Sequence, residues 1–259
     1  GTLTLQTGDV LSVENISIEE SGTLKGDISG QAEIHVSGNW DLEDGGTFTH
    51  NSTVSVYLTG NSESIISGTN TFYKLISDHI RSDTGSDKAL KFSAGTTQTI
   101  TSTLTLKGSS GNLMPISSTN SDNAATLNVS GATVNAEYLN ITDTILSGYD
   151  SYPGDANNNT DSGGNSGWFT PPSITFTSIS PSNGVVSVGS SITLVATAEN
   201  NETGLTVSSA TINGKHVSGA FTDKDDGTYE FVYTVGLGDT TIADSADLPV
   251  AIILQDSVG

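Results

Sequence analysis

Cysteine is absent from this 259-residue sequence, so the chain has no disulfide framework, no zinc–thiolate site and no catalytic thiol. Basic residues are scarce: eight lysines and arginines stand against 29 acidic residues, which gives a formal net charge of −21. This balance argues against nucleic acid and anionic lipid as partners, because both need a basic protein surface. Long apolar runs are also missing. None approaches the roughly 20 residues of a membrane helix, so we expect no membrane insertion.

The sequence is rich in hydroxyl side chains and acidic charge. Serine and threonine number 73, and glycine adds 29 residues. Excess negative charge keeps a protein soluble, and hydroxyl side chains are well tolerated on the surface of a β-sheet. This composition is typical of a bacterial cell surface, so we expect an extracellular or cell-surface location. The sequence begins at Gly1 without a signal peptide, so we expect either a signal already removed or a piece of a longer protein.

Helix-forming patterns are nearly absent, whereas short runs that alternate apolar and polar residues recur along the whole chain. Each run is bounded by Gly, Ser, Asn or Asp, which is the pattern of strands joined by turns. We therefore predict an all-β protein. In its first 145 residues, the positions predicted to face the interior are Ile34, Val36, Val54, Val56, Leu58, Leu104, Leu106, Leu127 and Val129.

A Gly-Thr step recurs at Gly22, Gly46 and Gly68, at spacings of 24 and 22 residues. A period in the low twenties with strands and tight turns is typical of a β-solenoid, in which each turn buries its apolar side chains on its neighbours. The alternative is an ordinary sandwich, but sandwich strands recur about every 8–12 residues without a longer repeat. We predict a parallel β-solenoid over residues 1–145.

Two further regions follow the repeat. Residues 146–172 contain few aliphatic residues and many Gly and Asn, so we interpret them as an end loop, an aromatic cap at Trp168 and Phe169, and a stiff linker. Residues 173–259 contain longer strands with distinct turns, which favours an antiparallel sandwich of the immunoglobulin type. The strands predicted there cover residues 174–180, 191–198, 205–212, 228–235 and 248–256.

Two family resemblances agree with this division. The segment GNWDLEDGGTFTHNSTVSVYLTGNSESIISGTNTFYKL and its continuations KFSAGTTQTITSTLTLKGSSGNL, ATLNVSGATVNAEYLNITD and DSGGNSGWF resemble a repeat of large secreted bacterial surface proteins. That resemblance covers most of residues 37–169 and implies a right-handed β-solenoid of the haemagglutinin or adhesin type. Residues 173–259 are similar to bacterial Ig-like domains through SPSNG, TINGK and FTDKDDGTYEFVYTV. Both resemblances imply stalks, spacers and adhesive surfaces rather than an enzymatic activity.

Parallel β-helices also include polysaccharide lyases, so an enzyme has to be considered. The one arginine, Arg81, lies near Asp78, His79, Asp83 and Asp87, and a lyase could use such groups as a base and as calcium ligands. The cluster is confined to one turn-rich segment, whereas a lyase site needs groups that converge from successive turns, so we interpret it as a solvated loop. Nucleophile and nucleotide-binding motifs are missing as well. We predict no enzyme, no catalytic residue and no cofactor.

Calcium is the one metal for which the sequence suggests a binding site. Asp155, Asn157, Asn159 and Asp161 alternate as D-x-N-x-N-x-D, which would place four oxygen ligands on one side of a loop. The hand-type calcium loop also needs Gly and Glu at its sixth and twelfth positions, where this chain has Thr and Ser, so that motif fails. A second acidic cluster is better explained as a turn before a strand, and consists of Asp223, Asp225 and Asp226. We predict no metal ligand, with calcium as the alternative.

These observations favour a non-enzymatic extracellular structural or adhesive protein, either a rod-like surface stalk or part of an adhesin. The expected partners are other copies or other parts of a larger surface protein, with host or environmental glycans as further partners. One alternative is a self-assembling subunit of an extracellular filament or sheath. The other is a β-helix protein that binds or cleaves polysaccharide, with Trp40, Tyr57, Phe72 and Tyr73 as aromatic candidates. All of these except Tyr57 fall in the repeat motif and are predicted to be core or turn-capping residues.

The C-terminal strand predicts an interface. In Ig-like domains a strand like LPVAIILQD precedes a short hairpin and one last strand, but here the hairpin residues 256–259 end the sequence, so the last strand is expected to be missing. The open edge would then be a template for another chain, at Leu248, Val250, Ile252 and Leu254. Either the chain is a fragment, which is favoured because edges are normally covered within their own chain, or a neighbouring subunit donates a strand such as Thr2–Leu5 and builds a fibre.

Overall fold

The computed structural model describes residues 1–26, 30–78, 89–121, 123–170, 172–182, 185–201, 203–243 and 246–255. In this part of the chain the regular structure is almost entirely β, with both parallel and antiparallel sheets and a few one-turn 3-10 helices. The chain divides into two compact units, one that ends at Thr170 and one that follows it. Of the cluster around Arg81, Asp78 is described, whereas His79, Arg81, Asp83 and Asp87 lie outside the described residues, as does the hairpin 256–259. No helix among the described residues has the length and apolarity needed to span a membrane.

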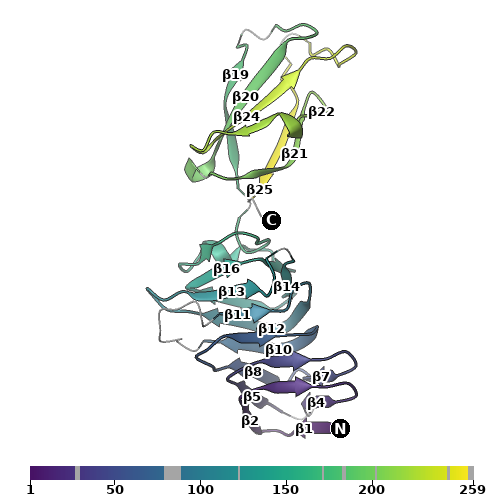
Figure 1. Cartoon of the computed structure of the whole chain (residues 1–259), viewed down its shortest axis with the longest axis vertical. Coiled ribbons are helices and arrows are strands. Elements are labelled where there is room, and N and C mark those ends of the chain that lie inside the picture. Colours follow the sequence, from purple (N-terminus) through teal and green to yellow (C-terminus); the bar gives the residue numbers. More distant parts are fainter. Residues whose placement is uncertain are drawn as a thin grey trace. The chain divides into compact units, whose positions relative to one another are not determined.

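The first unit consists of parallel strands that return to the same sheet once per turn of the chain, one above another (Figure 1). One sheet contains β1 (Thr2–Leu5), β4 (Thr23–Gly26) and β7 (Thr47–Thr49). A second sheet contains β2 (Val10–Val13), β5 (Ala32–Val36), β8 (Val54–Leu58), β10 (Asn70–Ser77), β12 (Thr97–Lys107), β14 (Ala125–Asn128), β15 (Thr133–Glu137) and β17 (Thr144–Ser147). A third sheet contains β3 (Ile16–Ile18), β6 (Trp40–Leu42), β9 (Ser64–Ile66), β11 (Leu90–Phe92), β13 (Met114–Ser118), β16 (Leu139–Thr142) and β18 (Thr160–Asp161).

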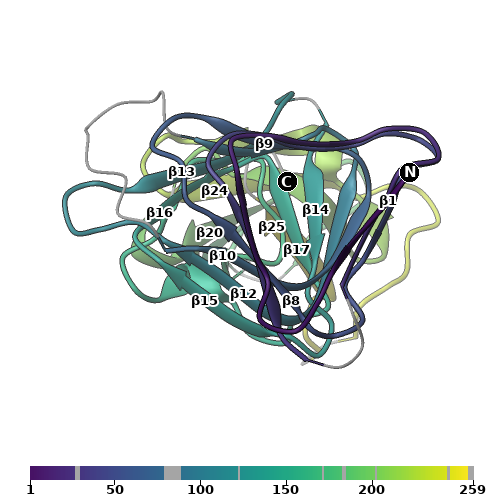
Figure 2. The same cartoon turned by 90° about the horizontal axis from the view of Figure 1, so that it is seen from below.

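Two long strands turn a corner and so belong to two sides of the first unit. The first part of β12, Thr97–Thr99, pairs with β14, whereas its second part, Thr103–Lys107, pairs with β15. The pairing of β10 with β12 changes register between Phe72 and Lys74, at the same corner. The strands therefore enclose a common interior on three sides, which Figure 2 shows end-on.

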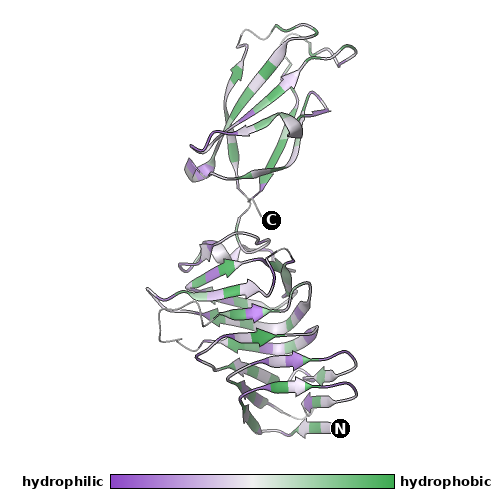
Figure 3. Cartoon of the chain, in the orientation of Figure 1, coloured by the Kyte–Doolittle hydropathy of each residue, from purple (hydrophilic) through white to green (hydrophobic). Residues whose placement is uncertain are grey.

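Columns of apolar side chains fill this interior, because each inward residue lies beside its partner in the next turn. Ile34, Val56, Leu75 and Leu104 are successive register partners, and all four are fully buried. Burial of each such side chain contributes about 1.5–3 kcal/mol. Apolar and polar residues alternate along these strands (Figure 3), as expected where one face of a strand lies in a core. All nine positions predicted to face the interior are buried, so that prediction is confirmed.

The repeat is less regular than the glycine spacing predicted. Successive partners in the Ile34 column are separated by 22, 19 and 29 residues, because the connections between turns differ in length. Gly22 and Gly46 do occupy equivalent positions, since the residues that follow them are register partners in β4 and β7. Gly46 and Gly68 have matching surroundings: an added Cβ would lie 2.4 Å from the Ile18 carbonyl oxygen at Gly46 and 2.1 Å from the Leu42 carbonyl oxygen at Gly68. Ile18 and Leu42 are themselves register partners.

A chain of buried polar side chains crosses successive turns of the first unit. The indole Nε1 of Trp40 donates a hydrogen bond to Asn70 Oδ1 over 2.7 Å, and Asn70 Nδ2 donates to Gln98 Oε1 over 2.8 Å. Gln98 Nε2 donates in turn to the Gly68 carbonyl oxygen over 2.8 Å. Asn70 and Gln98 are register partners, so the chain of bonds follows the stacking direction. Because buried polar groups are costly without partners, this network favours one alignment of the turns.

The parallel pairing continues past residue 145, where the sequence repeat stops. β17 ends at Ser147, and β18 pairs with β16 after a loop that contains the helix η2 (Pro153–Asp155). Trp168 is fully buried in the core of the first unit, and Phe169 packs against that core. The amide of Gly154 donates to the carbonyl oxygen of Trp168 and so ties the loop to the buried indole. Both aromatic side chains of the end loop thus contact the core of the first unit.

The second unit consists of two antiparallel sheets. One has the order β19 (Ile174–Ser180), β20 (Ser191–Ala198), β24 (Thr228–Thr234) and β23 (Phe221–Asp223). The other has the order β22 (Lys215–His216), β21 (Thr206–Ile212) and β25 (Val250–Gln255). The helices η3 (Glu199–Asn201) and η4 (Ser218–Ala220) lie in its connections. All five strands predicted for this region are confirmed, and the two shortest strands, β22 and β23, were not predicted.

Both sheets of the second unit pack on one apolar core. Every second residue of β20 is buried, and β24 buries Tyr229, Phe231 and Tyr233 in the same way. The facing sheet contributes Ala210, Ile212 and Leu254 to the same core. This core is separate from that of the first unit, so each unit has its own apolar interior.

Candidate functional site

The outward face of β5 and β8 carries a small group of aromatic and acidic side chains. His35 and Tyr57 are register partners, and their rings stack with centroids 4.7 Å apart at an angle of 16°. Glu33 Oε2 lies 2.9 Å from His35 Nε2, and both side chains are partly exposed. We call Glu33, His35 and Tyr57 the His35–Tyr57 patch. It exists because outward residues, like inward ones, stack on their partners in the next turn.

Acidic neighbours set the electrostatics of this patch. Burial raises the pKa of Tyr57, and the charges of Glu33 and Asp78 raise it further, against a smaller lowering by a hydrogen bond with Ser55. A phenol with a raised pKa stays protonated at neutral pH, so Tyr57 is a poor base or nucleophile. The protonated Tyr57 hydroxyl can therefore donate a hydrogen bond to a ligand at neutral pH.

The other aromatic candidates divide between the interior and the surface. Trp40 and Phe72 are fully buried and form one ring cluster with Phe48, so the core position predicted for them is confirmed. Tyr73 is only partly buried, and its ring stacks on His50 with centroids 6.1 Å apart. A core position for Tyr73 is therefore wrong, because Tyr73 follows Phe72 on the strand and points to the opposite face.

The side chains of the D-x-N-x-N-x-D run hold turns of the end loop. Asp155 accepts hydrogen bonds from the backbone amide of Thr170 at 3.1 Å. Asn157 and Asn159 each donate to a backbone carbonyl oxygen, and Asp161 accepts from a loop amide. Such bonds are the usual role of Asp and Asn in turns. Among the described residues, no three His, Asp or Glu side chains are arranged to hold a metal ion.

The second acidic cluster also stabilises turns. Asp223 accepts from the backbone amides of Gly204 and Asp225, over 2.9 and 2.8 Å. Asp226 accepts from the amide of Thr228, and hydrogen bonds from Thr228 lower the pKa of the Asp226 carboxyl. These carboxylates cap the hairpin that leads into β24, as the sequence predicts for a turn.

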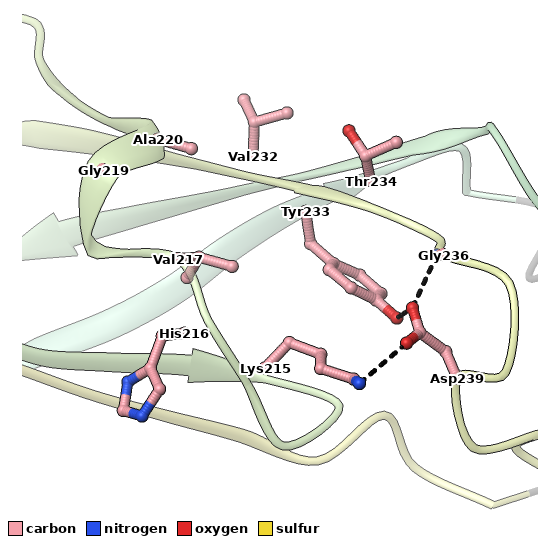
Figure 4. Close-up of a pocket in the computed structure, with 10 residues that line it drawn as sticks. All are labelled: Lys215, His216, Val217, Gly219, Ala220, Val232, Tyr233, Thr234, Gly236 and Asp239. Carbon is pink, nitrogen blue, oxygen red and sulfur yellow. Dashed lines mark hydrogen bonds and ion pairs between the residues drawn. The ribbon is translucent and has the colours of Figure 1, made fainter.

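A pocket of about 410 Å³ lies beside β22 and β24 in the second unit (Figure 4). Asp239 accepts hydrogen bonds there from Tyr233 Oη and the Gly236 amide, both over 2.6 Å, and Lys215 Nζ lies 3.0 Å from its other oxygen. The Tyr233 and Gly236 bonds, followed by Lys215, lower the pKa of Asp239 to about 2. A carboxylate held ionised by three donors is no proton donor at neutral pH. The arrangement clamps the connection between β24 and β25 to the end of β22.

Three of the four residues of the predicted interface lie on β25, and Leu248 precedes it. Leu254 is buried, and Leu248, Val250 and Ile252 are partly buried against the core of the second unit. β25 pairs with β21 on one side, and among the described residues it has no strand on its other side. These apolar side chains therefore face the core, while the backbone of β25 forms one edge of its sheet.

The proposed donor strand is already paired. Thr2–Leu5 forms β1, which pairs with β4 in register from Thr2 to Leu5. Leu5 is buried in the core of the first unit. Donation of this segment would break these hydrogen bonds and expose Leu5, so the prediction that Thr2–Leu5 is an available donor is wrong.

Two surface features thus stand out among the described residues: the His35–Tyr57 patch and the edge of β25. Neither brings together a nucleophile, a base and an oxyanion-binding group, which are the parts of a typical hydrolytic site. No family model matches the chain, and neither a curated protein nor a solved structure matches it.

Proposed function

We propose that this chain is a non-enzymatic structural and adhesive module that works outside the cell. The observation that carries this proposal is the parallel stack of the first unit, whose apolar core includes residues from Leu5 to Trp168. Each turn is hydrogen-bonded to its neighbours along several strands, and its side chains interlock with theirs. Such stacks are stiff along their axis, which suits a stalk or spacer.

We further propose that the first unit is a right-handed β-solenoid and the second an Ig-like sandwich. Right-handedness is supported by the strong general preference of connections between parallel strands. The sheet order β19-β20-β24-β23 corresponds to strands A, B, E and D of an immunoglobulin domain, and β21 and β25 then take the positions of strands C and F. The strands assigned to A, B, C, D, E and F also occur in this order along the sequence, as β19, β20, β21, β23, β24 and β25.

The surface chemistry supports an extracellular role. Outward positions on the large parallel sheet include Ser12, Ser55, Thr103, Thr105 and Thr133, and Thr103 and Thr133 are register partners of each other. Hydroxyl groups hydrate the surface without adding titratable groups. Together with the net charge of −21 and the absence of cysteine, they suit an exposed protein that must stay soluble.

Localisation tests the proposal directly. Antibodies raised against the purified chain are used for immunogold electron microscopy of the cells that produce it. We expect gold on the cell surface or in the surrounding matrix. Gold confined to the cell interior would overturn the extracellular role. In parallel, the chain is incubated with neutral and acidic polysaccharides, and release of reducing ends would contradict the non-enzymatic role.

Polysaccharide binding is a second candidate function. It is favoured by the outward position of two His–Tyr ring pairs, His35 with Tyr57 and His50 with Tyr73. A glycan array probed with the labelled chain tests this function. We expect Tyr57→Ala to abolish any signal, while the control Thr105→Ala, on the same outward face, leaves it unchanged. Equal signals from both variants would contradict binding at the His35–Tyr57 patch.

A further inference from the structure

β24 is longer than the strand on one of its sides. β20 pairs with all of β24, Thr228–Thr234, whereas β23 on the other side pairs only with Tyr229–Phe231. Before β23 the chain lies in η4, where the Ala220 amide donates to the Val217 carbonyl oxygen rather than to β24. Among the described residues, no strand therefore lies beside Val232–Thr234 on this side of β24.

The free part of this edge directs backbone groups into the gap. Along an antiparallel strand, the N–H and C=O groups of successive residues point alternately to the two sides. The Lys224 amide donates to the Thr228 carbonyl oxygen on the β23 side, and the Val235 amide donates to a carbonyl oxygen on the β20 side. Even-numbered residues of β24 therefore point toward β23. Val232 and Thr234 thus present N–H and C=O groups that pair with no other described residue.

The pocket of about 410 Å³ occupies this gap (Figure 4). Val232 and Thr234 line one of its walls, and Val217 and Ala220 line another. This volume lies in the range of about 300–1,000 Å³ that is typical of sites for small ligands. β23 occupies the same row at one end of the gap, and the connection that contains Asp239 borders the other end. A long extended polypeptide therefore cannot run along this edge, because β23 lies in its path, whereas a compact ligand fits.

The pocket offers both donors and acceptors of hydrogen bonds. Lys215 Nζ lies 3.0 Å from Asp239, but its side chain is 54% exposed and it has further N–H donors. The charges of Lys215 and Asp239 offset each other, so this pair adds no net charge. Each hydroxyl of a sugar both donates and accepts, which matches the alternating N–H and C=O groups of Val232 and Thr234. The side chain of Ala220 can pack on the C–H groups of the ring. These features fit a neutral sugar better than a charged ligand.

We propose that this pocket binds the terminal residue of a neutral glycan, with the sugar hydroxyls on the free edge of β24. The ligand enters as the end of a sugar chain rather than its middle, because β23 closes one end of the gap. The proposal gives the adhesive role above a ligand class, and it rests on that role. The site lies in the second unit, so it is separate from the His35–Tyr57 patch of the first.

Methyl glycosides of glucose, galactose and mannose are the probes, because each is a neutral single ring. Each is titrated into the ¹⁵N-labelled full chain, and the amide signals of Val232 and Thr234 are followed by NMR. We expect at least one sugar to shift both signals, since both amides donate to its hydroxyl groups. Ala220→Leu should weaken binding of that sugar about tenfold, because the longer side chain fills part of the pocket and displaces hydrogen bonds.

Failure of the pocket is distinguishable from failure of the adhesive role. Shifts confined to the His35–Tyr57 patch would overturn the pocket as a sugar site and leave glycan binding by the first unit standing. Gold confined to the cell interior would overturn the adhesive role, whereas the titration measures the pocket in solution and does not depend on location.

The matched control is Ser218→Leu, since Ser218 is exposed in the same helix η4 and does not line the pocket. This variant should bind the sugar as the parent chain does. The proposal is overturned if no sugar shifts both amide signals at millimolar concentration, or if Ala220→Leu and Ser218→Leu bind equally well. It is also overturned if N-acetylglycine methylamide, a probe with the groups of a peptide, binds more tightly than every sugar.

Discussion

The two units cover the edges of their sheets in different ways. In the first unit almost every strand has a parallel neighbour on both sides, and the loop that carries Trp168 and Phe169 packs against the last turns. In the second unit the sheets are narrow, and β19 and β25 lie at their edges. In a stack of turns, each inner strand is paired on both sides. In a small sandwich, the outer strands of each sheet are paired on one side only.

Their interiors differ as well. The core of the first unit is a set of columns, so each inward side chain contacts equivalent residues in the turns before and after it. The core of the second unit is a single cluster between two sheets, with tyrosine hydroxyls that reach hydrogen-bond partners at its margin. A substitution in the first unit therefore disturbs neighbouring turns, whereas one in the second disturbs the whole unit.

Val56→Asp should have the largest effect and tests whether the cores of the two units unfold independently. Val56 lies in the middle of a fully buried column, so the substitution loses about 1.5–3 kcal/mol of apolar burial. It also buries a polar group without a partner, which costs about 2–7 kcal/mol more. We expect the amides of β5, β8 and β10 to lose protection while the amides of β20 and β24 stay protected, as measured by hydrogen exchange with mass spectrometry.

Ser55→Asp is the control for that substitution, because Ser55 is adjacent in sequence but points outward. Its effect should be much smaller than that of Val56→Asp, because the added charge stays in water, beside the like charge of its register partner Glu33 and the opposite charge of its other partner Lys74. Loss of protection in both units with Val56→Asp would show that the two cores unfold as one. A neutral Val56→Asp would show that the assignment of inward and outward residues is wrong.

The sequence predicted the columns because alternation has a physical cause that is local. A strand with one face in a core must alternate, so residues such as Ile34 and Leu104 could be assigned without knowing their neighbours. The lengths of the connections follow no such rule. The spacings of 22, 19 and 29 residues in the Ile34 column therefore could not be predicted, and the corner within β12 gave no sequence signal.

The surface features were harder to predict, because they depend on which strands pair and in which register. The stack of His35 on Tyr57 requires the register of β5 with β8, and 22 residues separate the two side chains. The pocket beside β24 requires knowledge that β23 pairs with only part of β24. A resemblance to a family could predict an open edge at β25, but not the groups that line this pocket.

Asn70→Leu should have the next largest effect and tests the polar chain of the first unit. The substitution leaves Trp40 Nε1 and Gln98 Oε1 without the partners that Asn70 supplies. Each buried group without a partner costs about 1–3 kcal/mol. Urea unfolding followed by tryptophan fluorescence measures the loss, because Trp40 and Trp168 are the only tryptophans of the chain and both lie in the first unit.

Asn135→Leu is the matched control, since Asn135 is exposed on an outward face of the same unit. It should change the free energy of unfolding by no more than about 0.5 kcal/mol. If Asn70→Leu is as mild as Asn135→Leu, the buried polar chain does not contribute to the alignment of the turns.

Asp239→Asn tests the clamp of the second unit through its pH dependence. The pKa of Asp239 is about 2 in the folded protein, below its ordinary value of 3.8. A lowered carboxyl pKa stabilises the folded state above pH 3.8, and that stability is lost as the pH falls from 3.8 to about 2. We expect the parent chain to show this loss in the second unit and the variant to lack it, in NMR spectra recorded across this range. A variant with an unchanged acid profile would contradict the clamp.

His50→Gln should have the smallest effect. It tests whether the two units begin to lose stability at different pH values. His50 Nδ1 accepts a hydrogen bond from the Ser52 amide over 2.9 Å, and burial lowers the pKa of the imidazole below 6.5. A lowered histidine pKa means that the folded state binds the proton less well than the unfolded state, so stability falls as the pH drops below 6.5. The first unit should therefore begin to lose stability near pH 6.5, where the Asp239 clamp of the second unit is still intact. Tryptophan fluorescence in urea, measured between pH 7.5 and 5, should show a decline in the parent chain that His50→Gln reduces. An identical decline in both proteins would assign the sensitivity to another group of the first unit.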